Sequence, residues 1–320
     1  MSIQGTSSLK VKDMCNDSGY VPGEIPAAYL DFESASGKPY PPAPEPLPVP
    51  VIDNHTHLDF APGKAGTAGV RAAMDAAAAA GVRAAVQVGT DLASSRFTVQ
   101  VLDEEPRLLG AVAIHPNDAP VLAAEGTLDA ALEEIEALAR HPRVRGIGET
   151  GLDYFRTGPD GVERQQYSFR RHIDIAKRLG LALQIHDRDA HDDVVRVLLE
   201  EGAPENVVFH CFSGDAGLAR ICNTNGWRMS FAGTLTFKNA GNLREALAVA
   251  DRRLLLVETD SPFLTPHPFR GRPNASYMVP HTVRFMASEL GADLAELGQL
   301  LVDNTVDVYG SWSTGDGAPA

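Results

Sequence analysis

Eight short apolar segments, each followed by a segment with helical features, constrain the fold of this chain most strongly. Most of them are continuous apolar runs, the pattern of parallel strands that are buried on both faces. Eight strand–helix repeats over about 260 residues predict an α/β fold, the (β/α)8 or TIM barrel. The expected strands are Val49–His55, Val82–Val88, Leu108–His115, Val144–Glu149, Leu181–His186, Val207–Phe212, Trp227–Phe231 and Leu254–Asp260.

The segments between these strands carry helix start and stop signals. Several of them stop at a glycine, which favours the left-handed conformation that commonly ends a helix, and the last begins with a proline. The expected helices are Ala68–Ala80, Thr127–Arg140, Glu163–Leu179, Asp189–Glu201, Asn239–Ala250 and Pro280–Leu290.

The two ends of the chain differ from the repeating part. Residues 1–48 form a Pro-rich N-terminal extension, with closely spaced prolines from Pro39 to Pro48. Such prolines favour extended polyproline geometry and cannot enter the interior of a sheet, so we expect an arm on the surface. The barrel then spans residues 49–310, and residues 311–320 are expected to be a disordered tail.

The charge of the chain limits how it can bind nucleic acid. The formal net charge is −14, and 44% of the residues are hydrophobic. A negative surface repels polyanions at long range, which argues against a protein that slides along DNA. Any phosphate substrate would have to be captured locally, by metal ions and a few basic side chains.

The cysteines and the apolar runs bear on location. Cys15, Cys211 and Cys222 are an odd, small set that predicts no disulfide framework. The N-terminus lacks the apolar core of a signal peptide, and no stretch approaches the about 18 apolar residues of a membrane span. We therefore expect a cytoplasmic protein with no membrane association.

Histidines and carboxylates stand at the ends of the expected strands. His55 and His57 are two residues apart at the end of the first strand, so their side chains project to one side. In a (β/α)8 barrel, functional groups collect at the carboxyl ends of the strands, where distant residues converge. The predicted metal ligands are His55, His57, Glu149, His186, His210 and Asp260.

These residue types suit a two-metal hydrolytic site. Imidazoles and carboxylates bind divalent ions such as Zn or Mn, and carboxylates also hold Mg. The two oxygens of Glu149 can bridge two ions, which together activate a water and neutralise a developing oxyanion. Asp260 would hold one ion and accept the proton of the water as general base.

Two further residues, His115 and Cys211, lie at or near the ends of the expected strands. His115 ends the third expected strand before Pro116, so it is expected to face the pocket and contact the substrate. Cys211 follows His210 directly, and strand alternation predicts that it points to the opposite side and serves packing.

At these residues the sequence resembles the TatD family of metal-dependent deoxyribonucleases, which are amidohydrolase-like metallohydrolase barrels. The resemblance covers residues from about 50 to 310, and the motifs follow one another in the order of the family. The matching pieces are Asp53-x-His55-x-His57, Ile114-His115-Pro116, Gly148-Glu149-Thr150-Gly151-Leu152-Asp153-Tyr154, His186-x-Arg188-Asp189-Ala190, His210-Cys211-Phe212-Ser213-Gly214 and Glu258-Thr259-Asp260-Ser261-Pro262.

The resemblance implies a reaction and a substrate. It implies phosphodiester hydrolysis at DNA ends, with exonuclease character, aided by one or two Mg, Mn or Zn ions per chain. Because no groove-reading helix is evident, single strands or frayed ends are the expected substrates. Arg188, and Arg270 and Arg272 in a later loop, are candidates for contacts to substrate phosphates.

Two other functions are compatible with such a barrel. An amidohydrolase-type enzyme could use the same metals on amides, esters or lactones. Many such enzymes bridge their metals with a carboxylated lysine at the end of the fourth strand, where this chain has Glu149. A non-enzymatic barrel with a structural metal is the third candidate. It is disfavoured because six polar side chains in one barrel mouth would cost free energy without an evident structural benefit.

Overall fold

A computed structural model describes residues 20–30, 37–60 and 66–312. Its eight strands form one parallel sheet in the order of the sequence, and a bridge between Thr56 and Ser261 links the start of the sheet to its end. This is the (β/α)8 barrel that the sequence predicted. The strands are β1 (Val51–Thr56), β2 (Val82–Val88), β3 (Leu108–Val112), β4 (Val144–Asp153), β5 (Ala182–Arg188), β6 (Val207–Phe209), β7 (Arg228–Phe231) and β8 (Leu255–Val257).

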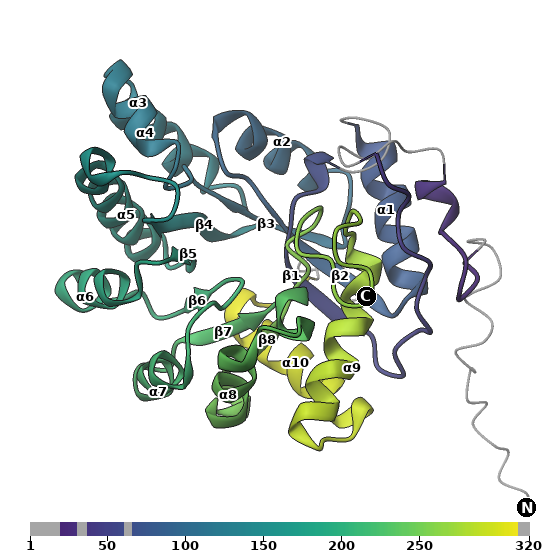
Figure 1. The fold of residues 1–320 in the computed structure, drawn as a ribbon. Helices are drawn as coiled ribbons and strands as arrows, with labels where there is room; N and C mark the ends of the chain where they lie inside the picture. The colour runs from purple at the N-terminus through teal and green to yellow at the C-terminus, as the bar shows by residue number, and fades with distance from the viewer. Residues whose placement is uncertain (1–19, 31–36, 61–65, 313–320) are drawn as a thin grey trace, which may run out of the picture.

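Helices surround the strands on the outside of the barrel (Figure 1). Four of them, α2, α3, α7 and α10, were not among the helices expected from the sequence. None of the described helices is long and apolar enough to cross a membrane. The helices are α1 (Thr67–Ala79), α2 (Leu92–Leu102), α3 (Ala119–Glu125), α4 (Leu128–Leu138), α5 (Pro159–Leu179), α6 (His191–Glu201), α7 (Ala216–Asn225), α8 (Gly241–Val249), α9 (Val279–Leu290) and α10 (Leu294–Tyr309).

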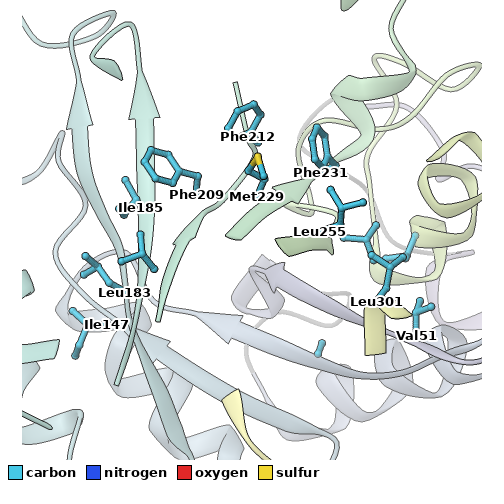
Figure 2. Close-up of a cluster of buried hydrophobic side chains, with 14 of the residues drawn as sticks. Val51, Ile147, Leu183, Ile185, Phe209, Phe212, Met229, Phe231, Leu255 and Leu301 are labelled. Carbon is cyan, nitrogen blue, oxygen red and sulfur yellow. The ribbon is translucent and has the colours of Figure 1, made fainter. Parts of the chain in front are cut away.

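Alternation along the strands divides the core into two clusters. Side chains such as Leu183 and Ile185 of β5 belong to the larger cluster, which includes residues of the helices (Figure 2). A smaller cluster includes Val208 and Leu256 together with Tyr309, near the end of α10. Because the strands are buried on both faces, they are continuous apolar runs in the sequence.

The described part of the N-terminal extension packs against the barrel. Residues 37–48, which we call the strap, run beside α1 and α9 (Figure 1). Tyr40 of the strap is buried, and its ring centroid lies 4.6 Å from that of Tyr29, which in turn lies 5.2 Å from that of Tyr277. The strap therefore shares the hydrophobic core of the barrel.

Polar side chains of the barrel hold the backbone of the strap. The hydroxyl of Tyr277 donates to the carbonyl of Pro41 at 2.6 Å, and the Arg272 guanidinium donates to the carbonyls of Pro39 and Tyr40. These partners matter because the prolines of the strap have no N–H of their own to pair. Residues 1–19, 31–36 and 313–320, which include most of the expected tail, lie outside the described residues.

Candidate metal centre

A pocket of about 660 Å³ opens where the strands end, and it contains most of the predicted functional residues. Five of the six predicted ligands line it, and His55 lies fully buried beneath them. His210 follows β6 directly, whereas Glu149 lies inside β4, which is longer than the sequence suggested. Side chains from five strands or their ends therefore converge on one space.

The first group of donor atoms comes from β1, β4 and the segment after β8. The Nε2 atoms of His55 and His57 lie 3.3 Å apart. They lie 3.5 and 3.7 Å from Oε2 of Glu149, and 3.8 and 3.4 Å from Oδ1 of Asp260. Ligands about 2.1 Å from a tetrahedral ion are separated by about 3.4 Å, so this first donor group has the spacing that a divalent cation requires.

The second donor group surrounds the other oxygen of the same carboxylate. Oε1 of Glu149 lies 2.6 Å from Nδ1 of His186, 2.8 Å from Nε2 of His210 and 3.4 Å from Nε2 of His115. The two oxygens of Glu149 thus face two different sets of histidines. A carboxylate in this position can join two cations, which is the arrangement expected of a two-metal site.

Hydrogen bonds behind the rings orient several of these histidines. Nδ1 of His57 lies 2.9 Å from the carbonyl oxygen of Val88 on β2. Nε2 of His186 lies 3.2 Å from Oδ2 of Asp153. Such outer partners fix the ring of a metal-binding histidine and raise its basicity. Asp153 was not singled out from the sequence, although it follows Glu149 in the motif that carries the resemblance.

Glu258 has the same relationship to His210. Its Oε1 lies 3.2 Å from Nδ1 of His210 and accepts a hydrogen bond of 2.7 Å from the backbone N–H of Cys211. The Glu258 side chain is completely buried. It was also missed in the sequence, where it stands two positions before Asp260.

The donor groups shift one another's pKa values strongly. Burial alone would raise the pKa of the Glu149 carboxyl, but the surrounding histidines, first among them His210, hold it well below its usual range. Burial lowers the pKa of His57, but the hydrogen bond and charge of Asp260 outweigh it and bring the value to about 9. The site is thus built to collect positive charge at a buried pair of carboxylates.

A further buried histidine supports the site from α5. His172 accepts a hydrogen bond of 3.1 Å at Nε2 from the N–H of Ile114, and its Nδ1 donates to the carbonyl of Ser168 at 2.8 Å. Thr150, beside Glu149, lies 3.0 Å from the same Nδ1. The neutral imidazole therefore connects α5 to the segments that carry His115 and Glu149.

The three arginines considered from the sequence lie in different places. Arg188 lines the pocket, with its guanidinium stacked 3.8 Å from the ring centroid of Phe155. Arg156, which was not among the predicted phosphate contacts, lines the pocket too. Arg270 and Arg272 are not among the lining residues. Arg270 is exposed and stacks on Phe237, and Arg272 is occupied by the strap.

Comparison with known proteins identifies the family to which this fold belongs. The family model described as TatD related DNase matches residues 52–310. The Mycobacterium tuberculosis protein named "Uncharacterized metal-dependent hydrolase TatD" is 44% identical over 264 residues, which cover 81% of this chain and 98% of that protein. The Escherichia coli metal-dependent hydrolase YcfH is 35% identical, over 81% of this chain and 95% of that protein.

Solved structures give the same result. The chain superposes on YJJV, a TatD homologue from Escherichia coli, with a TM-score of 0.74 and 28% sequence identity, over 81% of this chain and 97% of that one. An organophosphorus hydrolase mutant, at 16% identity and a TM-score of 0.57, shares the fold. The chain therefore belongs to the TatD-related DNase family and is a metal-dependent hydrolase. The resemblance drawn from the sequence motifs is confirmed.

Proposed function

We propose that this protein hydrolyses phosphodiester bonds at the ends of DNA, with exonuclease character, through two cations held by the two donor groups. The position of Glu149 carries the proposal, because its two oxygens face separate sets of histidines 2.6–3.7 Å away. Two joined cations can stabilise both the attacking and the leaving oxygen of a displacement at phosphorus, and the match to the family described as TatD related DNase favours a phosphodiester over an amide or a carboxylic ester.

The residues would hold the ions as follows. His55, His57 and Asp260 form one position, His186 and His210 the other, and Glu149 belongs to both. Bound cations would polarise a phosphoryl oxygen and lower the pKa of a water. The mixture of imidazole nitrogens and carboxylate oxygens suits Zn or Mn, and Mg is a third candidate.

Asp260 is the proposed base. Burial would raise the pKa of its carboxyl, but the hydrogen bond with His57 and the charges of the histidines lower it below its usual value. The group is therefore ionised at neutral pH and can accept a proton from the attacking water. Its side chain, 13% exposed, faces the pocket from the segment after β8.

Phosphate contacts would come from the opposite part of the barrel mouth. Arg188 and Arg156 line the pocket, and Arg188 is held by its stacking on Phe155. His115 would contact the same phosphate beside the second donor group. With a net charge of −14, the protein would capture DNA through these local contacts rather than by long-range attraction.

We also propose a cytoplasmic location, supported by the free thiols of Cys211 and Cys222.

The test is hydrolysis of end-labelled single-stranded DNA by chelator-stripped protein, with Mg, Mn and Zn restored separately. Metal-dependent release of nucleotides is expected, and Asp260→Asn should abolish it. Asp303→Asn, an exposed carboxylate on α10, is the matched control and should retain full activity. No release with any metal, together with cleavage of small carboxylic esters or amides, would move the assignment to the amide, ester and lactone hydrolases.

A further inference from the structure

Two exposed phenylalanines stand at the pocket, each three residues after a member of the first donor group. Phe60 follows His57, and its N–H donates to the His57 carbonyl at 3.2 Å. Phe263 follows Asp260, and its N–H donates to the Asp260 carbonyl at 2.9 Å. Each phenylalanine is 52% exposed. The same kind of turn therefore places an aromatic ring next to the first donor group from two different strands.

The two rings form one apolar wall. The ring centroids of Phe60 and Phe263 lie 6.1 Å apart, and the Phe263 centroid lies 6.3 Å from that of His57. Both residues line the pocket. Exposed aromatic side chains beside the histidines and carboxylates of the pocket indicate a ligand with an apolar face, because nothing in the described structure covers them.

The segment that carries Phe263 is held firmly. Asn274, which is 2% exposed, donates through its side-chain amide to the carbonyls of Phe263 at 2.7 Å and Thr259 at 3.0 Å. The hydroxyl of Thr265 donates to the carbonyl of Arg272. The guanidinium of the same arginine donates to the strap at the carbonyl of Pro39. A ring on a rigid support loses little conformational entropy when a ligand stacks on it.

The opposite side of the barrel mouth has a different character. The two phenylalanines follow β1 and β8, whereas Arg156 lies in the segment after β4 and Arg188 ends β5, half-way around the barrel. A substrate that spans the pocket therefore meets aromatic rings at one end and cations at the other. A nucleotide chain has both complementary features, because its bases have apolar faces and its backbone carries phosphates.

We propose that Phe60 and Phe263 form a base-stacking subsite for the nucleotide on the first-donor-group side of the scissile phosphate. The inference rests on the proposed phosphodiesterase function and adds the residues that select the substrate. The next phosphate of the chain lies toward Arg188. Because a base cannot lie on these rings while it is stacked within a duplex, the subsite explains a preference for single strands and frayed ends.

The test compares oligonucleotides that differ only in one base. Each substrate is a single strand whose terminal residue is either intact or abasic, at the 5′ end in one set and at the 3′ end in the other. The protein digests these strands in the presence of Mn. Wild-type protein should release the intact nucleotide roughly tenfold faster at subsaturating substrate, as expected for loss of one stacked base. Phe60→Leu and Phe263→Leu should bring the ratio of kcat/KM for the intact strand to kcat/KM for the abasic strand close to one.

Two further variants separate stacking from simple packing. Phe263→Trp keeps an aromatic face and should retain the discrimination that Phe263→Leu loses. Tyr167→Leu replaces an exposed aromatic residue of α5 that does not line the pocket, and it should behave as wild type. Equal rates on intact and abasic strands in the wild type, with normal hydrolysis, would overturn the subsite and leave the phosphodiesterase function intact.

A binding measurement keeps the inference testable if no DNA is cleaved. Calorimetric titration of the Mn-loaded protein with thymidine 5′-monophosphate and with deoxyribose 5-phosphate should give roughly tenfold tighter binding of the nucleotide. Phe263→Leu should abolish that difference. Equal affinities in the wild type would overturn the subsite, whereas the expected difference without hydrolysis would support it and overturn only the proposed reaction.

Discussion

The carboxylate of Glu258 lies 3.2 Å from Nδ1 of His210, on the opposite side of the ring from the nitrogen that faces Glu149. The Glu258 side chain is completely buried, and the His210 side chain is 4% exposed. Of the donor residues, Glu258 is hydrogen-bonded to His210, and it also lies close to His55 beneath the site. Its effect should be on the orientation and basicity of that ring, and not on the substrate directly.

Replacing Glu258 should weaken the binding of one metal ion, because it removes the partner that orients His210. Loss of such an outer partner typically costs about 10–100-fold in metal affinity. We expect Glu258→Gln to show this loss for one of two bound ions in equilibrium dialysis. Glu105→Gln, which removes another buried carboxylate that pairs with Arg107, should leave both affinities unchanged. Equal losses in the two variants would contradict the role of Glu258.

Metal binding should release protons. Because Asp260 brings the pKa of His57 to about 9, that imidazole is protonated at neutral pH in the metal-free protein, yet it must be neutral to bind a cation. Apparent affinity should therefore increase as the pH rises toward 9. Calorimetric titrations with Zn in buffers of different ionisation enthalpy measure the protons released, and no dependence on the buffer would contradict the prediction.

Arg188 should contribute to the salt dependence of DNA binding. Removing one phosphate contact lowers the slope of log K against log salt by about 0.7 for a single strand. We expect this change in Arg188→Gln, measured by fluorescence anisotropy with catalysis blocked by Asp260→Asn. Arg270→Gln, at an exposed arginine outside the pocket, is the matched control. An unchanged slope in Arg188→Gln would remove this residue from the binding site.

His172 should make the fold sensitive to acid. Burial lowers its pKa to about 4, below the value of about 6.5 expected in the unfolded chain. Between these values the unfolded state binds a proton that the folded state does not, so stability is complete above pH 6.5 and falls as the pH approaches 4. The full effect is about 3 kcal/mol.

Denaturant unfolding across this pH range measures the effect of His172. The His172→Gln variant should be less stable at pH 8, because the pairing with Ile114 is altered, but its stability should fall less steeply with acid. His267→Gln, at an exposed histidine, should retain the wild-type slope. Identical slopes in all three proteins would show that His172 is not the responsible group.

The strap should depend on Arg272. This guanidinium donates to the carbonyls of Pro39 and Tyr40, and hydrogen bonds to a charged donor are each worth about 2 kcal/mol. Arg272→Ala should lower the melting temperature and increase hydrogen exchange in residues 37–48. Arg270→Ala should do neither. Protection of the strap at wild-type levels in Arg272→Ala would show that the tyrosine contacts suffice.

Local patterns were sufficient for the barrel because parallel strands are buried on both faces, and each of the eight apolar runs overlaps an observed strand. Where the chain leaves a strand, alternation no longer predicts the direction of a side chain. Cys211 was expected to point away from His210, but β6 ends at Phe209, Cys211 has a φ of 40°, and it lines the pocket.

Long-range partners were the other feature that the sequence could not supply. The basic loop suggested phosphate contacts for Arg272, yet its partners are carbonyls of the strap more than 230 positions earlier. Likewise, nothing in the local pattern distinguishes Glu258, whose importance comes from its proximity to His210 in the folded barrel. The helix α2 was not predicted, although Asp91 and Ser94 form a capping box at its start.

The joining of the two ends of the barrel has a consequence for biosynthesis. Asp53 accepts hydrogen bonds from Thr259, 206 positions later, and this contact lies next to His55 and Asp260. The first donor group is therefore incomplete until almost the entire barrel has left the ribosome. A chain that ends before Asp260 carries His55, His57 and Glu149 but lacks the Asp260 carboxylate of the first donor group. We therefore expect hydrolytic activity only from molecules whose synthesis has passed Asp260.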